Sequence, residues 1–226
     1  MSKVVLITGA NRGIGLELAR LYASQDCEVI AVCRESSDEI EELADQVLSG
    51  LDLTDDQATD VILQLLDVTL GEGGKIDVLI NNAGVFKNET LQDMDLDTIR
   101  LQFEVNAITP LKITHALMPY LKEGSKVANV TSRMGSVEDN GSGAYYGYRA
   151  SKAALNAFGK SLAIDLKPKG VSVAMLHPGF VQTRMVGFNG DISPVQAATG
   201  IASRIEELTL QNSGGFWHSN GEVLPW

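Results

Sequence analysis

The stretch that decides the fold is KVVLITGANRGIGLELARLYASQ, residues 3–25. Residues 3–8 are predicted to form a strand, with the apolar run VVLI at 4–7. Residues 13–25 have the periodicity of an amphipathic helix. The connection between them, TGANRGIG at 8–15, carries glycines at 9, 13 and 15. Because a helix start offers unpaired N–H groups, this strand, turn and helix together predict a loop that binds a pyrophosphate.

The same alternation of strand and helix continues to the end of the chain. Strands are predicted at 27–33, 76–81, 126–132 and 171–177, with a short one running into 51–53. Helices are predicted from about 37 and from 54 to about 70, where Ser36 with Glu39 and Thr54 with Gln57 have capping-box spacing. Ser193 and Pro194 predict a later helix start. The pattern predicts an α/β fold, a single Rossmann-like doubly wound domain with a central parallel sheet flanked by helices on both faces.

Composition and charge narrow the class of protein. The chain has 226 residues, 44% of them hydrophobic, and a formal net charge of −11. The negative charge argues against nucleic acid or an anionic membrane as a partner. No apolar run approaches the roughly 20 residues that cross a bilayer, and the short run at 4–7 is expected to be a strand rather than a signal segment. Cys27 and Cys33 lie about 20 Å apart on one predicted strand, so they are expected to be free thiols, which favours the cytoplasm.

In such a fold, ligands bind beyond the carboxyl ends of the strands. The unusual residues of the chain fall there, at Thr8–Gly9, Arg34, Asp52, Asn81–Asn82, Thr131–Ser132 and His177–Gly179. No pattern of three metal ligands is present, no Gly-x-Ser-x-Gly motif supports a hydrolase, and His115 and His218 are predicted to be isolated structural histidines.

The segment AYYGYRASK, residues 144–152, holds three tyrosines and a lysine. Residues four apart share one helix face, so Tyr148 is paired with Lys152. Tyr145 lies about 10 Å from Lys152 along the helix axis, and Tyr146 points away from Tyr148. A free tyrosine has a pKa of about 10, and an adjacent ammonium favours the phenolate. We therefore expect Tyr148 to be the general acid/base, with its pKa lowered by Lys152.

Taken together, these motifs resemble those of the short-chain dehydrogenase/reductase family. The matching motifs are TGANRGIG at 8–15, NNAG at 81–84, Asn106, Ser132, Tyr148-x-x-x-Lys152 and Pro178-Gly179, in family order. The resemblance covers nearly the whole chain. The ending, GGFWHSNGEVLPW, is most similar to a branch that contains the signal protein C-factor and small NADPH-dependent carbonyl reductases. Residues 1 to about 105 would then be the cofactor half, and about 106–226 the catalytic and substrate half.

The resemblance implies a catalytic set of Asn106, Ser132, Tyr148 and Lys152. Ser136 is an alternative to Ser132, because the interval from Ser132 to Tyr148 is longer than is common in the family. Asn106 also has an argument of its own: Pro110 has no N–H, so the carbonyl of Asn106 loses its helical partner and is free to hold a water. An ordinary helix kink is the alternative.

The resemblance also implies the residues of a nicotinamide cofactor site. These are Gly9, Asn11, Arg12, Gly13, Ile14, Gly15, Arg34, Asp52, Leu53, Asn82, Ala83, Gly84, Tyr148, Lys152, Pro178, Gly179, Val181 and Thr183. Arg34 at the end of the second strand, with Arg12, favours the 2′-phosphate of NADP(H) over NAD(H). Glu35 could instead hold a ribose, and Ser36 and Ser37 could donate to either cofactor.

Substrate and assembly are less determined. Only nine residues separate Thr183 from Ser193, which predicts a short lid and an open pocket; its candidate substrate-binding residues are Ser132, Met134, Tyr148, Phe180, Met185 and Phe188. We expect an oxidoreductase that interconverts ketones or aldehydes and alcohols with NADP(H). The alternatives are a cofactor-binding signalling or regulatory protein resembling C-factor and a nucleotide-sugar epimerase. The helix at 150–166 and that around 107–121 are apolar beyond one stripe, which predicts a homodimer or homotetramer; residues 203–226 folding over them would leave a monomer.

Overall fold

A computed structural model describes residues 2–71 and 73–226 of the chain. Seven strands form one parallel sheet in the order β3-β2-β1-β4-β5-β6-β7. Their bounds are β1 Val4–Thr8, β2 Glu28–Val32, β3 Gln46–Leu48, β4 Val78–Asn81, β5 Lys126–Val130, β6 Ser172–His177 and β7 Phe216–His218. The order reverses between β1 and β4, which is where a doubly wound sheet leaves a crevice for a ligand. The predicted fold class is confirmed.

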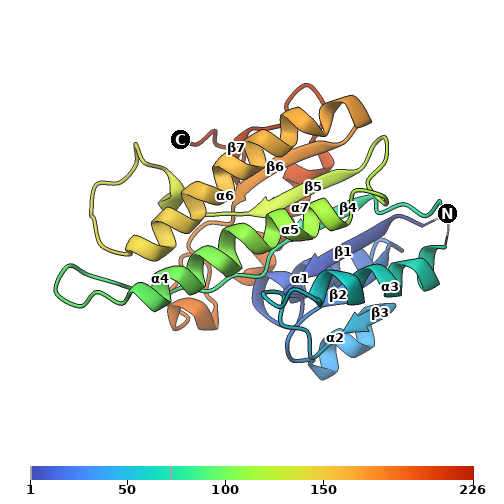
Figure 1. The fold of residues 1–226 in the computed structure, drawn as a ribbon, viewed down its shortest axis with the longest axis horizontal. Helices are drawn as coiled ribbons and strands as arrows, with labels where there is room; N and C mark the ends of the chain where they lie inside the picture. Colours follow the sequence, from blue (N-terminus) through green and yellow to red (C-terminus); the bar gives the residue numbers. More distant parts are fainter. Residues whose placement is uncertain (1, 72) are drawn as a thin grey trace.

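Helices cover both faces of the sheet (Figure 1). Their bounds are α1 Gly13–Ala23, α2 Asp38–Leu43, α3 Ala58–Leu70, α4 Leu96–Phe103, α5 Thr109–Ala116, α6 Tyr146–Asp165 and α7 Pro194–Glu206. Helices α3, α5 and α6 pack on one face, and α1, α2 and α7 on the other. Among the described residues, no helix has the length and apolar character needed to cross a membrane.

The strands are apolar throughout because they have a core on each side. In β1, Val4 and Leu6 point into one core, and Val5 and Ile7 into the other. The same alternation holds in β2, where Ile30 and Val29 face opposite cores. This is the two-residue period of a strand with both faces buried, and it explains why the sequence shows continuous apolar runs rather than alternation with polar residues.

Three local predictions are wrong. β3 ends at Leu48, before the predicted 51–53, because Gly50 turns the chain with φ +75°. Thr54 does not cap a helix; its hydroxyl donates to Asp52, and α3 begins only at Ala58. The cap of α2 is Ser37 rather than Ser36, since the Ser37 hydroxyl accepts from the N–H of Ile40.

The C-terminal segment adds an element that the sequence did not predict. Residues Phe216–His218 form β7, which pairs in parallel with β6 at the edge of the sheet. The ring of His218 meets that of His177 edge to face at 4.9 Å, so His218 is not isolated as expected. The predicted start of α7 is confirmed, with Ser193 and Gln196 forming a capping box and Pro194 in the first turn.

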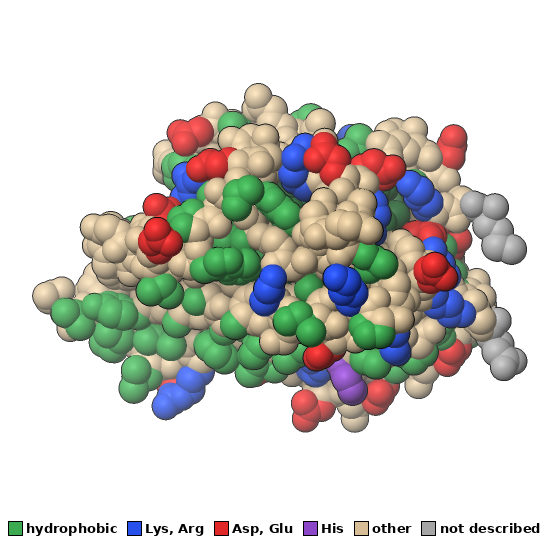
Figure 2. Space-filling model, turned by 90° about the horizontal axis from the view of Figure 1, so that it is seen from above, with side chains coloured by type: hydrophobic (Ala, Val, Ile, Leu, Met, Phe, Trp, Pro, Cys, Tyr) green, Lys and Arg blue, Asp and Glu red, His purple; other side chains and the backbone are tan. Residues whose placement is uncertain are grey.

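Charged side chains are distributed widely over the face of the molecule shown in Figure 2, whereas hydrophobic ones gather toward the left of the view. That end of the molecule holds the segments before α4 and α6 (Figure 1). Exposed apolar side chains in these segments include Leu91, Met94 and Val137. Both cysteines are free, as predicted, with Cys33 buried. The cytoplasmic location, the single-domain organisation and the division into two halves stay predictions.

Candidate active site

The glycine-rich loop is held in a shape that only glycine allows at two positions. Gly9 has φ +66°, and a Cβ there would lie 2.9 Å from the Cα of Ala83. At Gly15, a Cβ would lie 2.2 Å from the carbonyl oxygen of Gly9. The close contact lets the start of α1 fold back on the end of β1, so that its unpaired N–H groups face the crevice. An N-terminus without acidic residues in its first turn suits an anion such as a pyrophosphate.

Asn82 fixes this loop from the neighbouring strand. Its side-chain amide donates to the carbonyls of Thr8 and Gly9 at 3.0 and 3.1 Å. The hydroxyl of Thr8 in turn accepts from the backbone N–H groups of Asn82 and Ala83. The ends of β1 and β4 are therefore joined directly at the point where the strand order reverses.

The two predicted arginines lie at the same end of the sheet. Arg12 is the exposed N-cap of α1 and Arg34 follows the end of β2, also exposed. A hydrogen bond of 3.1 Å from Ser37 to the carbonyl of Asn11 joins the two segments. Neither arginine forms an ion pair within the described residues. Ser36, by contrast, bonds to Glu41, so its hydroxyl already has a protein partner.

Two further predicted cofactor residues lie beyond β3. Asp52 accepts hydrogen bonds from the backbone and the hydroxyl of Thr54, which lower the pKa of its carboxyl group. Leu53 is buried, and its carbonyl accepts from Thr109 at 3.5 Å. Both residues thus line the edge of the sheet near Arg34, which also contributes to lowering the Asp52 pKa.

A cavity of about 510 Å³ opens beyond the ends of β5 and β6. Of the predicted catalytic residues, Ser132 and Tyr148 line it directly. The cavity is also bordered by predicted residues of both ligand sets: Ile14, Met134, Pro178, Gly179, Phe180, Val181, Thr183 and Met185. The structure thus brings together side chains from β1–α1, β5, α6 and β6. Phe188 is not among the cavity residues; it is 66% exposed, with φ +63°.

Lys152 lies beneath Tyr148. Its ammonium group is 5.9 Å from the centre of the Tyr148 ring and donates to the carbonyl of Val130 at 2.9 Å. The side chain is buried, and this burial lowers the pKa of Lys152 to about 8. Gly135 allows the close packing, because a Cβ there would lie 2.7 Å from the backbone of Lys152.

The direction of the Tyr148 pKa differs from the expectation. Burial raises the pKa of Tyr148, and the hydrogen bond with Ser132 acts in the opposite direction but is the smaller effect. Lys152, whose ammonium lies 5.9 Å from the centre of the ring, does not contribute to this shift. In this state Tyr148 holds its proton at neutral pH, which is the form that can donate one.

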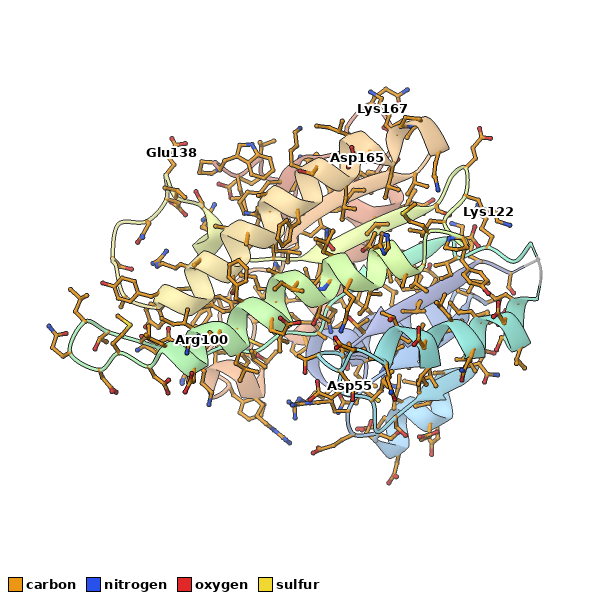
Figure 3. The ribbon with its side chains drawn as sticks, in the orientation of Figure 1. Asp55, Arg100, Lys122, Glu138, Asp165 and Lys167 are labelled. Atoms are coloured by element: carbon orange, nitrogen blue, oxygen red, sulfur yellow. The ribbon has the colours of Figure 1, made fainter. Side chains whose placement is uncertain are left out.

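Ser132 and its alternative have different surroundings. Ser132 follows β5 and lines the cavity together with Tyr148, and its hydroxyl accepts from the N–H of Met134 at 3.1 Å. Ser136 is turned away from the cavity: its hydroxyl donates to the carbonyl of Trp226 at 3.0 Å and accepts from the N–H of Asp139. The geometry therefore favours Ser132. The loop that leads from these two serines to α6 reaches the surface, where the labelled Glu138 points outward (Figure 3).

Asn106 lies in a helix interruption, as its sequence context predicts. Residues Glu104–Ile108 form a π-helical turn between α4 and α5, in which the N–H of Thr109 bonds to the carbonyl of Glu104. The side chain of Asn106 bonds to both backbone groups of Val85 and to the hydroxyl of Ser151. It thereby links the segment after β4 to the helix that carries Tyr148 and Lys152.

Sequence reasoning missed two residues around Tyr148. Phe86 meets the Tyr148 ring edge to face at 4.9 Å and stacks on Tyr145 at 5.6 Å. Glu89 is buried and accepts from the N–H of Gly147 at the start of α6, at 3.0 Å. Both follow the NNAG motif closely, but nothing in their spacing indicates a partner some sixty residues further along the chain.

Comparison with known proteins identifies the family. The family model described as short chain dehydrogenase matches residues 3–191. The chain belongs to the short-chain dehydrogenase family. Two curated relatives are similar to it, one over nearly the whole chain and one over about two thirds of it.

The first is 1-hydroxy-2-glutathionyl-2-methyl-3-butene dehydrogenase of Rhodococcus sp. strain AD45, 38% identical over 98% of this chain and 99% of its own length. The second is the C-signal protein of Myxococcus xanthus, 42% identical over 68% of this chain and 94% of its own length. The resemblance to the branch that contains this signal protein is thus confirmed.

Solved structures of short-chain dehydrogenases agree with this fold along its whole length. An NADPH-bound carbonyl reductase from chicken fatty liver has a TM-score of 0.90, with 27% identity and coverage of 100% of this chain and 99% of that one. A carbonyl reductase from Pseudomonas aeruginosa PAO1 in complex with NADP has a TM-score of 0.83 and 29% identity, covering 100% of both chains.

Proposed function

We propose that this short-chain dehydrogenase is an NADP(H)-dependent carbonyl reductase. It interconverts ketones or aldehydes and the corresponding alcohols. The observation that carries the proposal is one cavity in which Ser132 and Tyr148 meet, with the buried ammonium of Lys152 beneath them. Reduction of a carbonyl needs a hydride at carbon and a proton at oxygen, and this arrangement supplies the proton.

Each residue has a distinct role in the proposal. Tyr148 donates its phenolic proton to the substrate oxygen as the alkoxide develops, and its raised pKa keeps that proton in place beforehand. The Ser132 hydroxyl bonds to the same oxygen and stabilises its charge. Lys152, with a pKa of about 8, is able to gain and lose a proton near neutrality and returns one to Tyr148. Asn106 positions the helix that carries Tyr148 and Lys152 by bonding to Ser151 on that helix and to Val85 in the segment after β4.

The cofactor proposal rests on the crevice between β1 and β4 and on two arginines. The glycine cradle formed by Gly9 and Gly15 leaves room for the pyrophosphate of a dinucleotide at the start of α1. The 2′-phosphate of NADP(H) would be bound by Arg12 and Arg34, both free of protein ion pairs among the described residues. When bound, NADPH supplies the hydride. The cofactor-bound carbonyl reductases among the similar structures support this choice.

A purely regulatory role resembling that of the Myxococcus relative is not favoured. A protein that only binds a cofactor has no need for a buried lysine beneath a cavity tyrosine, since burying that charge costs stability. The longer chain and different glycine spacing of nucleotide-sugar epimerases also disagree with this sequence.

The test is turnover. Purified protein is mixed with NADPH and a panel of aliphatic and aromatic aldehydes and ketones, and the consumption of NADPH is followed together with the alcohol formed. We expect reduction of several members, with NADPH preferred over NADH. Binding of NADPH without reduction of any carbonyl compound would favour the regulatory alternative.

A further inference from the structure

An arginine lines the substrate cavity without a counter-charge. Arg149 follows Tyr148 directly on α6, and both side chains border the same cavity. Its guanidinium donates to the hydroxyl of Ser142 at 2.8 Å and, weakly, to the carbonyl of Met134 at 3.5 Å. Its Nε is enclosed and has no hydrogen-bond partner. Both of its partners are neutral, and no ion pair to Arg149 occurs within residues 2–71 and 73–226.

The other charged side chains of the cavity already have partners. Arg133 lies on its wall but is paired with Asp139 at 3.4 Å and with Glu222 at 2.7 Å. Asp139, which also lines the cavity, is therefore engaged by Arg133. His177 carries no charge at neutral pH, because burial lowers its pKa to about 3. Among the described residues, Arg149 is thus the cation of this wall that has no acidic partner.

The remaining wall is mostly apolar and aromatic. Phe86, Met134, Tyr145, Phe180 and Met185 border the cavity between Tyr148 and the solvent. A ligand that matches these surroundings has an apolar body, a carbonyl group at Tyr148 and a negatively charged group that reaches Arg149. A guanidinium binds a carboxylate through charge-assisted and often paired hydrogen bonds, which favours this partner over a neutral polar group.

We infer that this cavity takes carbonyl substrates that carry a carboxylate, and that Arg149 is the residue that selects for it. The inference rests on the proposed carbonyl reductase function. In the reaction, the carbonyl carbon gains a hydride from NADPH, the oxygen gains a proton from Tyr148, and NADP⁺ leaves. The carboxylate takes no part in the chemistry and serves only to bind and orient the substrate.

The experiment compares matched neutral and anionic substrates. The probes are 3- and 4-carboxybenzaldehyde and their methyl esters, which place the same aldehyde on the same ring with and without a charge. Initial rates of NADPH consumption give kcat/KM for each. For at least one position isomer, we expect the carboxylate to be preferred over its ester by tenfold or more, mainly through KM, and the preference to decrease as salt is added.

Substitutions of Arg149 test whether this side chain causes the preference for the carboxylate over its ester. Arg149→Gln should lower the ratio of kcat/KM between acid and ester at least fivefold, and Arg149→Lys should retain part of it. The control is Arg184→Gln, which removes the same charge from an exposed position that does not line the cavity. That change should leave the ratio unaltered. Because the readout is a ratio, a general loss of activity does not imitate the effect.

The outcomes separate this inference from the proposed function. If the esters are reduced and no acid is preferred, the inference is overturned while the carbonyl reductase function stands. If Arg149→Gln keeps the preference, Arg149 is not the selecting residue. If Arg149→Gln does not fold, competition decides: benzoate should inhibit ester reduction by the unaltered protein at least tenfold better than benzamide, and equal inhibition would overturn the inference. If neither acid nor ester is reduced although other members of the carbonyl panel are, the inference is overturned and the proposed function stands. If no compound of the panel is reduced either, the proposed function itself fails.

Discussion

The carboxylate of Glu89 accepts a hydrogen bond of 3.0 Å from the backbone N–H of Gly147, in the first turn of the helix that carries Tyr148 and Lys152. Glu89 also accepts from Thr98 at 2.7 Å and from Gln102 at 2.6 Å, so one buried side chain joins α4 to the start of α6. A negative charge at a helix N-terminus is favourable, and here it also fixes where that helix begins. The position of Tyr148 thus depends on a residue from the segment after β4.

Replacing Glu89 should therefore be costly. Glu89→Ala leaves buried donors without an acceptor, at roughly 1–3 kcal/mol for each donor that finds no water. We expect the free energy of unfolding in urea to fall by at least about 2 kcal/mol. Glu138→Ala, at an exposed site on the loop before α6, should change it by less than about 0.5 kcal/mol (Figure 3). Equal effects of the two substitutions would show that the Glu89 contacts contribute little.

Replacing each of the three tyrosines of α6 and its cap by phenylalanine should have very different effects on activity. Tyr148→Phe removes the proposed proton donor and should lower kcat at least about 100-fold, while the affinity for NADPH stays within a few-fold. Tyr145→Phe keeps the ring that stacks on Phe86 and should retain most of the activity. Tyr146→Phe should do the same. Steady-state kinetics with one aldehyde suffices, and a Tyr145→Phe protein as inactive as Tyr148→Phe would exclude the assignment.

Lys152 should lower the stability of the cofactor-free protein. Its pKa is about 8 in the folded state and 10.5 in the reference state, so the unfolded chain binds more protons between these values and stability rises with pH across that window. Below pH 8 the whole cost remains, about 3 kcal/mol from the size of the shift. Lys152→Met should thus stabilise the protein by about 2 kcal/mol at pH 7, once the lost hydrogen bond to Val130 is included.

The measurement is urea denaturation of both proteins at pH 7 and at pH 10. The advantage of Lys152→Met should shrink at the higher pH. The exposed Lys167→Met (Figure 3) is the matched control and should show no such change. An advantage for Lys152→Met that is the same at both pH values would contradict the linkage.

Cofactor choice should depend on Arg34. A guanidinium–phosphate hydrogen bond contributes roughly 1.5–3 kcal/mol, so Arg34→Asp should raise the KM for NADPH at least about tenfold. The difference between the KM values for NADPH and NADH should become smaller. The same charge change in Arg100→Asp, on α4, should leave the KM for NADPH unaltered. Equal use of NADPH and NADH by the unaltered protein would rule out the proposed 2′-phosphate site.

Assembly can be tested at one exposed position. Ile164 on α6 is 63% exposed, in agreement with a helix that is apolar beyond the stripe that faces the sheet. Light scattering at micromolar concentration should give at least twice the chain mass of 24.2 kDa. Ile164→Lys should shift the protein toward the monomer, whereas Val68→Lys, at an 85% exposed site on α3, should not. A fully active monomer would disprove the homo-oligomer.

The sequence predicted the sheet well because its strands are buried on both faces and therefore read as plain apolar runs. The prediction failed where neighbouring residues were equally able to cap a helix, or where a strand was too short to show a pattern. Ser36 and Ser37 are neighbours of the same capping type, and it is Ser37 that accepts from the N–H of Ile40, while Ser36 bonds to Glu41. β7 is short and lies at the sheet edge, so its three residues carry too little pattern to be recognised.

The candidate site shows the same division. Tyr148 and Lys152 lie one helical turn apart, so their relation is visible in the sequence. Glu89 and Phe86 act through residues about sixty positions away, and Arg149 stands out only because the structure pairs Arg133 with acidic side chains and leaves Arg149 without one. The expected direction of the Tyr148 pKa was wrong for a related reason: burial, which the sequence does not show, is the largest effect on this pKa and raises it.

The hydrogen bonds from Asn82 to Thr8 and Gly9 have a consequence for the synthesis of the protein. The phosphate loop is encoded near the start of the chain, but the residue that fixes it is translated some seventy residues later. Because β1 pairs with both β2 and β4, its second neighbour is also missing until then. A nascent chain that has only completed β3 therefore carries the glycine loop without the hydrogen bonds from Asn82. We expect the proposed affinity for a dinucleotide to arise only after β4 has left the ribosome and entered the sheet.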